Sequence, residues 1–178
     1  MRTQEKNSLM VMGIDPGSLS CGYGIIKTNG TVSDYIASGE IRLNPKSPLH
    51  IRLKLLHEGL LSIIKQYKPS EAVVEKIFFA KSVRSALSLG HARAIALLSA
   101  SSEGVSVYEY SALEVKKTVT GYGRAEKAQV EAMVRRILNI DTPLSSDSAD
   151  ALALALCRTS RAKLDALTLK EVRKARLR

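Results

Sequence analysis

The chain has 178 residues, with 27 basic against 17 acidic ones and a formal net charge of +10. This length suits one domain with a single core, and the positive charge favours a polyanionic partner, either nucleic acid or an anionic membrane face. Two cysteines without paired spacing argue against a zinc site or a disulfide framework, and the lack of a long apolar run leads us to expect a soluble, cytoplasmic protein.

The first part of the chain has the composition of strands. Residues 9–15 and 22–28 are rich in Val, Ile, Met and Tyr and are separated by Pro16 and Gly17, which predicts two strands joined by a turn. Residues 32–43 resemble a third strand. An antiparallel group of strands is therefore expected before the first helix.

Helical and strand patterns alternate in the rest of the chain. Apolar residues that recur every three or four positions predict helices over 49–68, 82–103, 111–119, 125–139 and 146–164. Short apolar runs at 71–75 and 105–110 predict two more strands. This order predicts an α/β fold, a five-stranded mixed sheet flanked by helices.

One domain over residues 9–160 is expected, preceded by an N-terminal extension, 1–8, and followed by a basic tail, 161–178. Residues 158–178 hold eight Lys and Arg against two acids, so much of the positive charge lies at this end. The tail could contact DNA, extend the last helix, or fray.

Four acids stand where they could meet. Asp15 ends the first strand and Glu75 ends the fourth, and parallel neighbours would bring both to the sheet edge where ligands bind in α/β proteins. Asp147 and Asp150, three residues apart at the start of a helix, share one face of it. Four hard oxygen donors in one place would bind Mg²⁺ or Mn²⁺.

Each acid also has a purely structural interpretation. Asp15 suits a turn before Pro-Gly, Glu75 could form a surface ion pair with Lys76, and Asp147 and Asp150 suit the first turn of a helix. Three independent structural roles are less economical than one topology that brings all four together.

The motifs GIDPGSLSCGYGII, VVEKIFFAKSVRSALSLGHARA, EVKKTVTGYGRAEKAQV and SSDSADALALAL occur in this order within residues 9–158. They resemble those of the RuvC family, bacterial crossover (Holliday) junction endodeoxyribonucleases with a ribonuclease H-like fold. The resemblance implies that the catalytic acids are Asp15, Glu75, Asp147 and Asp150. Some family members carry His at the third position, whereas Asp147 keeps this site all-carboxylate.

The resemblance also implies the chemistry. Two Mg²⁺ ions, or Mn²⁺, would be held by the four acids with Asp15 bridging both ions, and a DNA phosphodiester would be hydrolysed to a 5′-phosphate and a 3′-hydroxyl. Symmetric paired nicks would resolve four-way DNA junctions in homologous recombination and DNA repair.

DNA-binding residues are expected in two segments. Phe78 is placed by the resemblance where the family's aromatic side chain stacks on an unpaired base; packing of Phe78 and Phe79 into the core is the structural alternative, which is weaker for Phe78 than for Phe79. Basic residues surround Gly121 and Gly123, where a solvated turn is the simpler alternative; the resemblance places phosphate contacts at Lys116 and Lys127, with Lys117 and Arg124 as further candidates.

The expected partners follow from the substrate. Two symmetric cuts require two sites related by a dyad, and the family dimerises largely through the helix at 82–103, so a homodimer is expected. A branch-migration motor complex is implied as a further partner. The histidines, His50, His57 and His91, are expected to be structural.

Three other classes of protein are alternatives. The related YqgF group of ribonuclease H-like proteins lacks the KIFFAK and GYGRAEK segments. An actin-like or sugar-kinase ATPase needs a second domain, for which 178 residues leave no room. The third alternative is a junction-binding protein with an inactive site, which the four intact acids disfavour and a cleavage assay would exclude.

Overall fold

The computed structural model describes residues 8–76 and 83–176, with side chains through residue 162 except at Arg84. Five strands form one sheet. They are β1 (Leu9–Asp15), β2 (Ser20–Thr28), β3 (Ser33–Arg42), β4 (Glu71–Glu75) and β5 (Ser106–Tyr110). The helices are α1 (Leu49–Tyr67), α2 (Val83–Ser102), α3 (Ala112–Thr120), α4 (Lys127–Leu138) and α5 (Ser146–Arg176).

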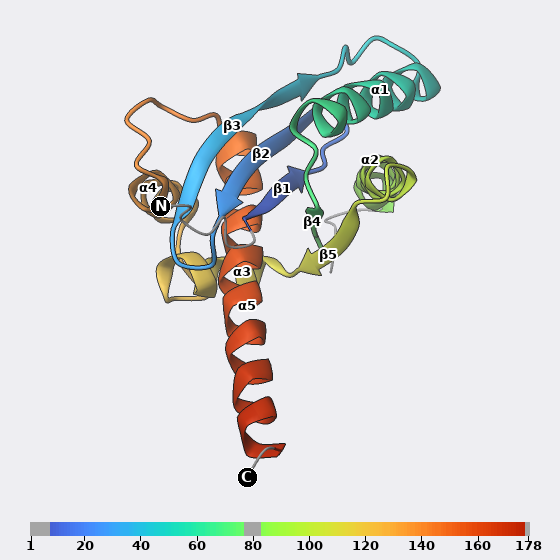
Figure 1. The fold of residues 1–178 in the computed structure, drawn as a ribbon. Coiled ribbons are helices and arrows are strands. Elements are labelled where there is room, and N and C mark those ends of the chain that lie inside the picture. Colours follow the sequence, from blue (N-terminus) through green and yellow to red (C-terminus); the bar gives the residue numbers. More distant parts are fainter. Residues whose placement is uncertain (1–7, 77–82, 177–178) are drawn as a thin grey trace.

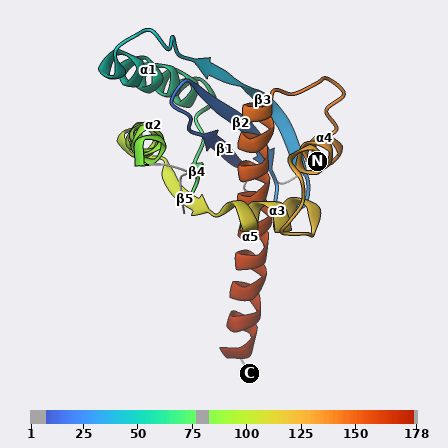
Figure 2. The ribbon, with the colours of Figure 1, turned by 180° about the vertical axis from the view of Figure 1, so that it is seen from behind.

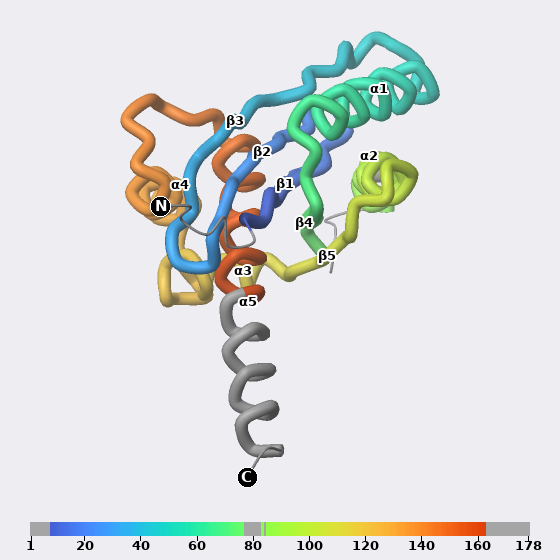
Figure 3. The backbone as a smooth tube through the Cα atoms, in the orientation of Figure 1, coloured from blue at the N-terminus to red at the C-terminus, as the bar shows by residue number. Residues whose placement is uncertain are grey.

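The sheet has the order β3-β2-β1-β4-β5 (Figure 1). β2 is antiparallel to both β1 and β3, while β1, β4 and β5 run parallel. The tube in Figure 3 shows how α1 carries the chain from β3 back to β4, so that β4 can lie parallel to β1. The predicted α/β fold with a five-stranded mixed sheet is confirmed.

Alternating residues of the strands bury two separate layers. Val11, Ile26 and Val73 pack with α3, α4 and α5 on one face. Met12 and Ile14 pack with α1 and α2 on the other. Figures 1 and 2 show these two groups of helices on opposite sides of the sheet. Because side chains alternate along a strand, knowing which face one residue packs against tells which face each of its neighbours points to.

The helix boundaries follow local chemistry. α3 begins with a capping box in which Ser111 and Glu114 satisfy each other's backbone N–H groups. α1 ends at Tyr67 and is capped by Lys68, which adopts the left-handed conformation before Pro69. α5 runs to Arg176, beyond the predicted end at 164, because the basic segment contains no Gly or Pro to stop a helix. No helix in the described part of the chain is long and apolar enough to cross a membrane.

Two glycines let α5 lie directly on the sheet. A Cβ atom added at Gly13 would stand 1.8 Å from the carbonyl oxygen of Ala151, and one at Gly22 would stand 2.1 Å from that of Asp147. Neither distance is compatible with a side chain. The glycines of β1 and β2 therefore set how closely the first turns of α5 approach the sheet.

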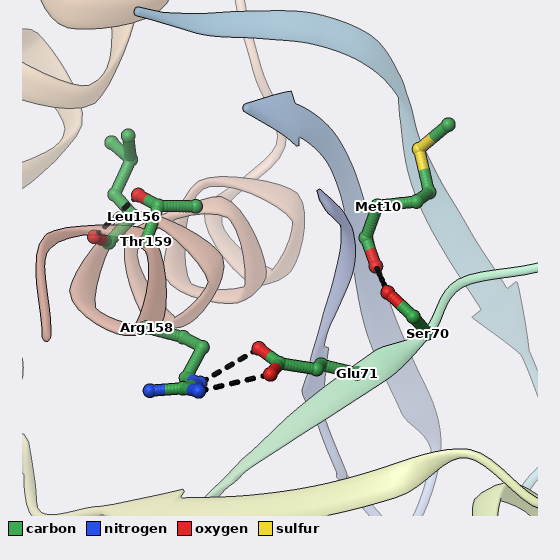
Figure 4. A network of polar contacts seen from close by, with 6 residues as sticks. All are labelled: Met10, Ser70, Glu71, Leu156, Arg158 and Thr159. Atoms are coloured by element: carbon green, nitrogen blue, oxygen red, sulfur yellow. Dashed lines mark hydrogen bonds and ion pairs between the residues drawn. The ribbon is translucent and has the colours of Figure 1, made fainter. Parts of the chain in front are cut away.

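A polar contact anchors the middle of α5 to β4. The guanidinium of Arg158 donates to both carboxylate oxygens of Glu71, at 2.7 and 2.9 Å (Figure 4), and lies 3.8 Å from the centre of the Tyr108 ring. The two charged side chains are only 8% and 12% exposed. This buried ion pair holds the helix in register with the strand that supplies Glu75.

Candidate active site

Two of the four predicted acids lie side by side at the carboxyl end of the central strands. β1 and β4 pair in parallel with Ile14 opposite Val74, so that the following residues, Asp15 and Glu75, are neighbours. Val73 packs against α5. Since Glu75 is two residues further along the same strand, both acids are directed to the α5 face of the sheet.

The other two acids come from the first turns of α5. Asp147 and Asp150 are three residues apart and share a face of the helix. Gly22 is the β2 partner of Asp15, and its lack of a side chain admits the backbone of Asp147 at this point. The close approach of α5 to β2 therefore brings the helix acids to the strand acids.

A cavity of about 210 Å³ lies between the sheet edge, α3, α4 and α5. Its polar lining consists of Asp15, Glu75, Asp150, Lys116 and Lys127, and the remainder is apolar. Asp147 stands on the same stretch of α5 but does not line this cavity. Three acids and two lysines from five different elements thus share one small volume.

The acids interact electrostatically. The pKa of Asp15 is raised to about 7, chiefly by burial and then by the negative charges of Asp150, Glu75 and Asp147, while Lys127 acts in the opposite direction. Burial also raises the pKa of Glu75, with a contribution from Asp150. A carboxyl group whose pKa is raised by three other carboxylates is one that a cation would stabilise.

Lys127 is the cavity lysine that forms an ion pair with one of the acids. Its ammonium group lies 2.6 Å from Oδ2 of Asp150. Burial tends to lower the pKa of Lys127, but the contact with Asp150 outweighs it and the pKa is raised. Among the described residues, no group of three or more Asp, Glu, His or Cys side chains is arranged to hold a metal ion as it stands.

The donor set nevertheless fits a hard divalent cation. All four acids offer oxygen, the ligand preferred by Mg²⁺ and Mn²⁺, and their mutual repulsion in a partly buried site disfavours full ionisation without added positive charge. A cation bound at Asp150 would compete with the ammonium group of Lys127.

The predicted DNA-binding residues fall into three groups. Lys116 and Lys127 line the acidic cavity. Lys117 and Arg124 are exposed, on α3 and in the loop before α4 respectively, and do not line it. Phe78 lies outside the described residues.

Some features of the site were not predicted from the sequence. Gly22 has no functional side chain. Its role in admitting the backbone of Asp147 becomes clear only from the strand register that places it opposite Asp15. Arg93 of α2 donates from Nε to the carbonyl oxygen of Glu75 at 3.3 Å and pairs with Glu109. The position of Arg93 within the helical pattern of the sequence does not indicate that it contacts the end of β4.

A mixed five-stranded sheet between helical layers, with carboxylates gathered at the end of its central parallel strands, defines the ribonuclease H-like class of nuclease. The family model described as crossover junction endodeoxyribonuclease RuvC matches residues 11–158. The chain belongs to this family, whose members are metal-dependent nucleases.

Relatives and solved structures agree with this assignment. The chain is 46% identical over 150 residues to the crossover junction endodeoxyribonuclease RuvC of Desulforamulus reducens, covering 84% of this chain and 92% of that protein. It is 47% identical over 148 residues to that of Saccharophagus degradans, covering 83% and 86%. The structure of Thermus thermophilus RuvC in complex with a Holliday junction substrate superposes with a TM-score of 0.84 at 32% identity, covering 88% of this chain and 96% of that one.

Proposed function

We propose that this protein is a crossover junction endodeoxyribonuclease that resolves four-way (Holliday) DNA junctions by symmetric paired nicks, in homologous recombination and DNA repair. The observation that carries the proposal is the meeting of acids from β1, β4 and α5 at one edge of a ribonuclease H-like sheet. The Thermus thermophilus relative, described in complex with a Holliday junction substrate, supports the same substrate here.

We further propose that Asp15, Glu75, Asp147 and Asp150 hold two Mg²⁺ ions, which Mn²⁺ can replace. Asp15 would be the central ligand of this set, because it lies between Glu75 on β4 and the Gly22 side of the sheet, where α5 brings Asp147. The chemistry that such ions would supply is the activation of a water and the stabilisation of the leaving 3′ oxygen. Hydrolysis leaves a 5′-phosphate and a 3′-hydroxyl, ends that a ligase can rejoin.

The lysines of the cavity serve the DNA. Lys127 neutralises Asp150 at 2.6 Å in the structure, and a cation bound there would release its ammonium group toward a phosphate. Lys116 lowers the pKa of Glu75 and lines the same cavity. Lys117 and Arg124, both exposed, extend the positive surface along α3 and the following loop. Such phosphate contacts place the scissile bond without reading sequence.

From the family resemblance, we propose that Phe78 stacks on an unpaired base of the junction. An aromatic ring only three residues after Glu75 in the sequence would stand near the cut site, and stacking on an unpaired base contributes about 1–3 kcal/mol. Replacing Phe78 by Leu should weaken the binding of junctions more than that of linear duplex.

Two protein partners complete the proposal. Paired nicks require two sites related by a dyad, and α2 carries apolar side chains that are strongly exposed in the monomer, Val83 at 78% and Leu87 at 60%. We therefore propose a homodimer that uses α2. We also propose a branch-migration motor complex as a partner and, because the substrate is chromosomal DNA, the bacterial cytoplasm as the location.

The test uses a synthetic four-way junction with each strand labelled in turn. In the presence of Mg²⁺, the wild-type protein should make nicks at symmetric positions that ligase can seal, and linear duplex of the same sequence should remain intact. Asp15→Asn should bind the junction and not cut it. Loss of junction binding by a folded Asp15→Asn protein would contradict the division between metal-holding acids and phosphate-binding lysines.

The role of the basic residues has a separate test. The logarithm of junction affinity should fall linearly with the logarithm of salt concentration, with a slope set by the number of phosphates neutralised. Lys116→Gln should reduce that slope by about one. Lys65→Gln is the matched control, since Lys65 pairs with Glu103 and neither residue lines the acidic cavity. Equal slopes for both variants would remove Lys116 from the DNA interface.

A further inference from the structure

The parallel ladder between β1 and β4 stops one residue before the two strand acids. Its last partners are Ile14 and Val74. At the next step of a parallel ladder, the carbonyl of Glu75 would accept a hydrogen bond from the residue after Asp15. That residue is Pro16, which has no N–H group to donate. The peptide group that follows Glu75 therefore receives no hydrogen bond from β1.

This peptide group is held from the other two sides. Its N–H, that of Lys76, donates to the carbonyl oxygen of Tyr110 on β5 at 2.8 Å. Its carbonyl oxygen, that of Glu75, accepts from Nε of Arg93 at 3.3 Å. The guanidinium of Arg93 is itself fixed by an ion pair with Glu109, and the two side chains are only 25% and 35% exposed.

We propose that Arg93 is a positioning residue for Glu75, because it replaces the ladder hydrogen bond that Pro16 cannot donate. It fixes the plane of the peptide group at the end of β4 and with it the direction of the Glu75 carboxylate toward Asp15. Glu109 holds the guanidinium in place. The inference rests on the proposed function, in which Glu75 is a metal ligand, and it assigns Arg93 no contact with DNA or with the reacting atoms.

The first experiment compares Arg93→Gln with wild type in the full-length protein, with Lys65→Gln as the matched loss of a cation. Three quantities are measured: the Mg²⁺ concentration that gives half-maximal junction cleavage, the junction affinity in EDTA, and the rise in Tm that Mg²⁺ produces. Arg93→Gln should raise the half-saturating Mg²⁺ about tenfold, the effect expected from losing support for a metal ligand. The rise in Tm at a fixed Mg²⁺ concentration should shrink, while junction affinity should equal that of Lys65→Gln.

A rescue variant separates positioning from general destabilisation. Pro16→Ala restores an N–H group at the position where the ladder would continue, so the double variant Pro16→Ala/Arg93→Gln should recover much of the lost Mg²⁺ affinity. If Arg93→Gln folds poorly, Glu109→Gln, which only frees the guanidinium, should shift the half-saturating Mg²⁺ in the same direction by a smaller factor.

The outcomes distinguish the inference from the proposed function. A lower Tm in EDTA with an unchanged half-saturating Mg²⁺ would make Arg93 merely structural and overturn the inference. If wild type does not cut junctions, the proposed function fails, and the Mg²⁺-dependent rise in Tm still decides whether Arg93 positions a metal ligand. An equal rise in Tm for wild type and Arg93→Gln would then refute the inference.

Discussion

Asp15→Asn should stabilise the metal-free protein at alkaline pH. The pKa of Asp15 is raised from 3.8 to about 7 by burial and by three neighbouring acids, a shift of about 3 units, each equivalent to about 1.36 kcal/mol. The folded state binds this proton more tightly than the unfolded state. Ionisation of Asp15 therefore does not destabilise the folded state below about pH 4, and the full destabilisation is present above about pH 7. The penalty amounts to at most about 4 kcal/mol, and an uncharged Asn removes it.

The assay is urea unfolding in EDTA at pH 5 and at pH 8, with Asp34→Asn, an exposed acid on β3, as the control. Asp15→Asn should gain stability relative to wild type between pH 5 and pH 8, whereas Asp34→Asn should not. Adding Mg²⁺ at pH 8 should stabilise wild type more than Asp15→Asn, because a ligand that binds only the folded state adds to its stability. The contrary result is that Asp15→Asn and wild type differ in stability by the same amount at both pH values. That result would refute the claim that burial and like charge raise the pKa of Asp15.

Three further predictions follow from the contacts around the site. Gly22→Ala places a Cβ atom 2.1 Å from the carbonyl oxygen of Asp147, so α5 must retreat; we expect about 1–3 kcal/mol of destabilisation in urea and about a 100-fold loss of cleavage rate at saturating junction. Wild-type cleavage would show that the start of α5 need not touch β2. Arg158→Met leaves buried Glu71 without its partner and should cost about 3–5 kcal/mol of unfolding free energy; a loss under 1 kcal/mol would mean that water reaches the carboxylate. Lys127→Gln removes a charge that lowers the pKa values of Asp15 and Glu75. The rise of Mg²⁺ affinity with pH, measured by calorimetry, should therefore shift to higher pH in this variant. An unchanged pH dependence would show that Lys127 does not affect the ionisation of these acids.

The elements of the fold could be predicted because each depends on a local pattern. Alternating or continuous apolar residues marked all five strands, and the three-to-four-residue recurrence marked the helices. The end of α5 could not be placed in the same way, because the basic segment neither buries a face nor contains a helix breaker, and only the structure shows the helix reaching Arg176. Apolar periodicity therefore predicts helices and strands that bury one face, but not the bounds of a solvated helical segment.

The candidate site could be predicted only in part, for a related reason. The acids at strand ends and at a helix start are visible in sequence, since a charge that closes an apolar run is conspicuous there. The residues that bring them together are not. Gly22 and Arg93 act through the register of strands distant in sequence, opposite Asp15 in one case and beside the Glu75 carbonyl in the other.

The position of Asp15 follows from how a parallel ladder ends. Within β1 the backbone groups are committed to β2 and β4, and a buried carboxylate there would have no water and no free donor. Because Pro16 cannot donate the next hydrogen bond, the pairing with β4 ends at Ile14 and Val74, which opens the edge of the sheet at Asp15 and Glu75. The charge is therefore placed where the ladder leaves room for a ligand, and the same proline that makes this room creates the need for Arg93.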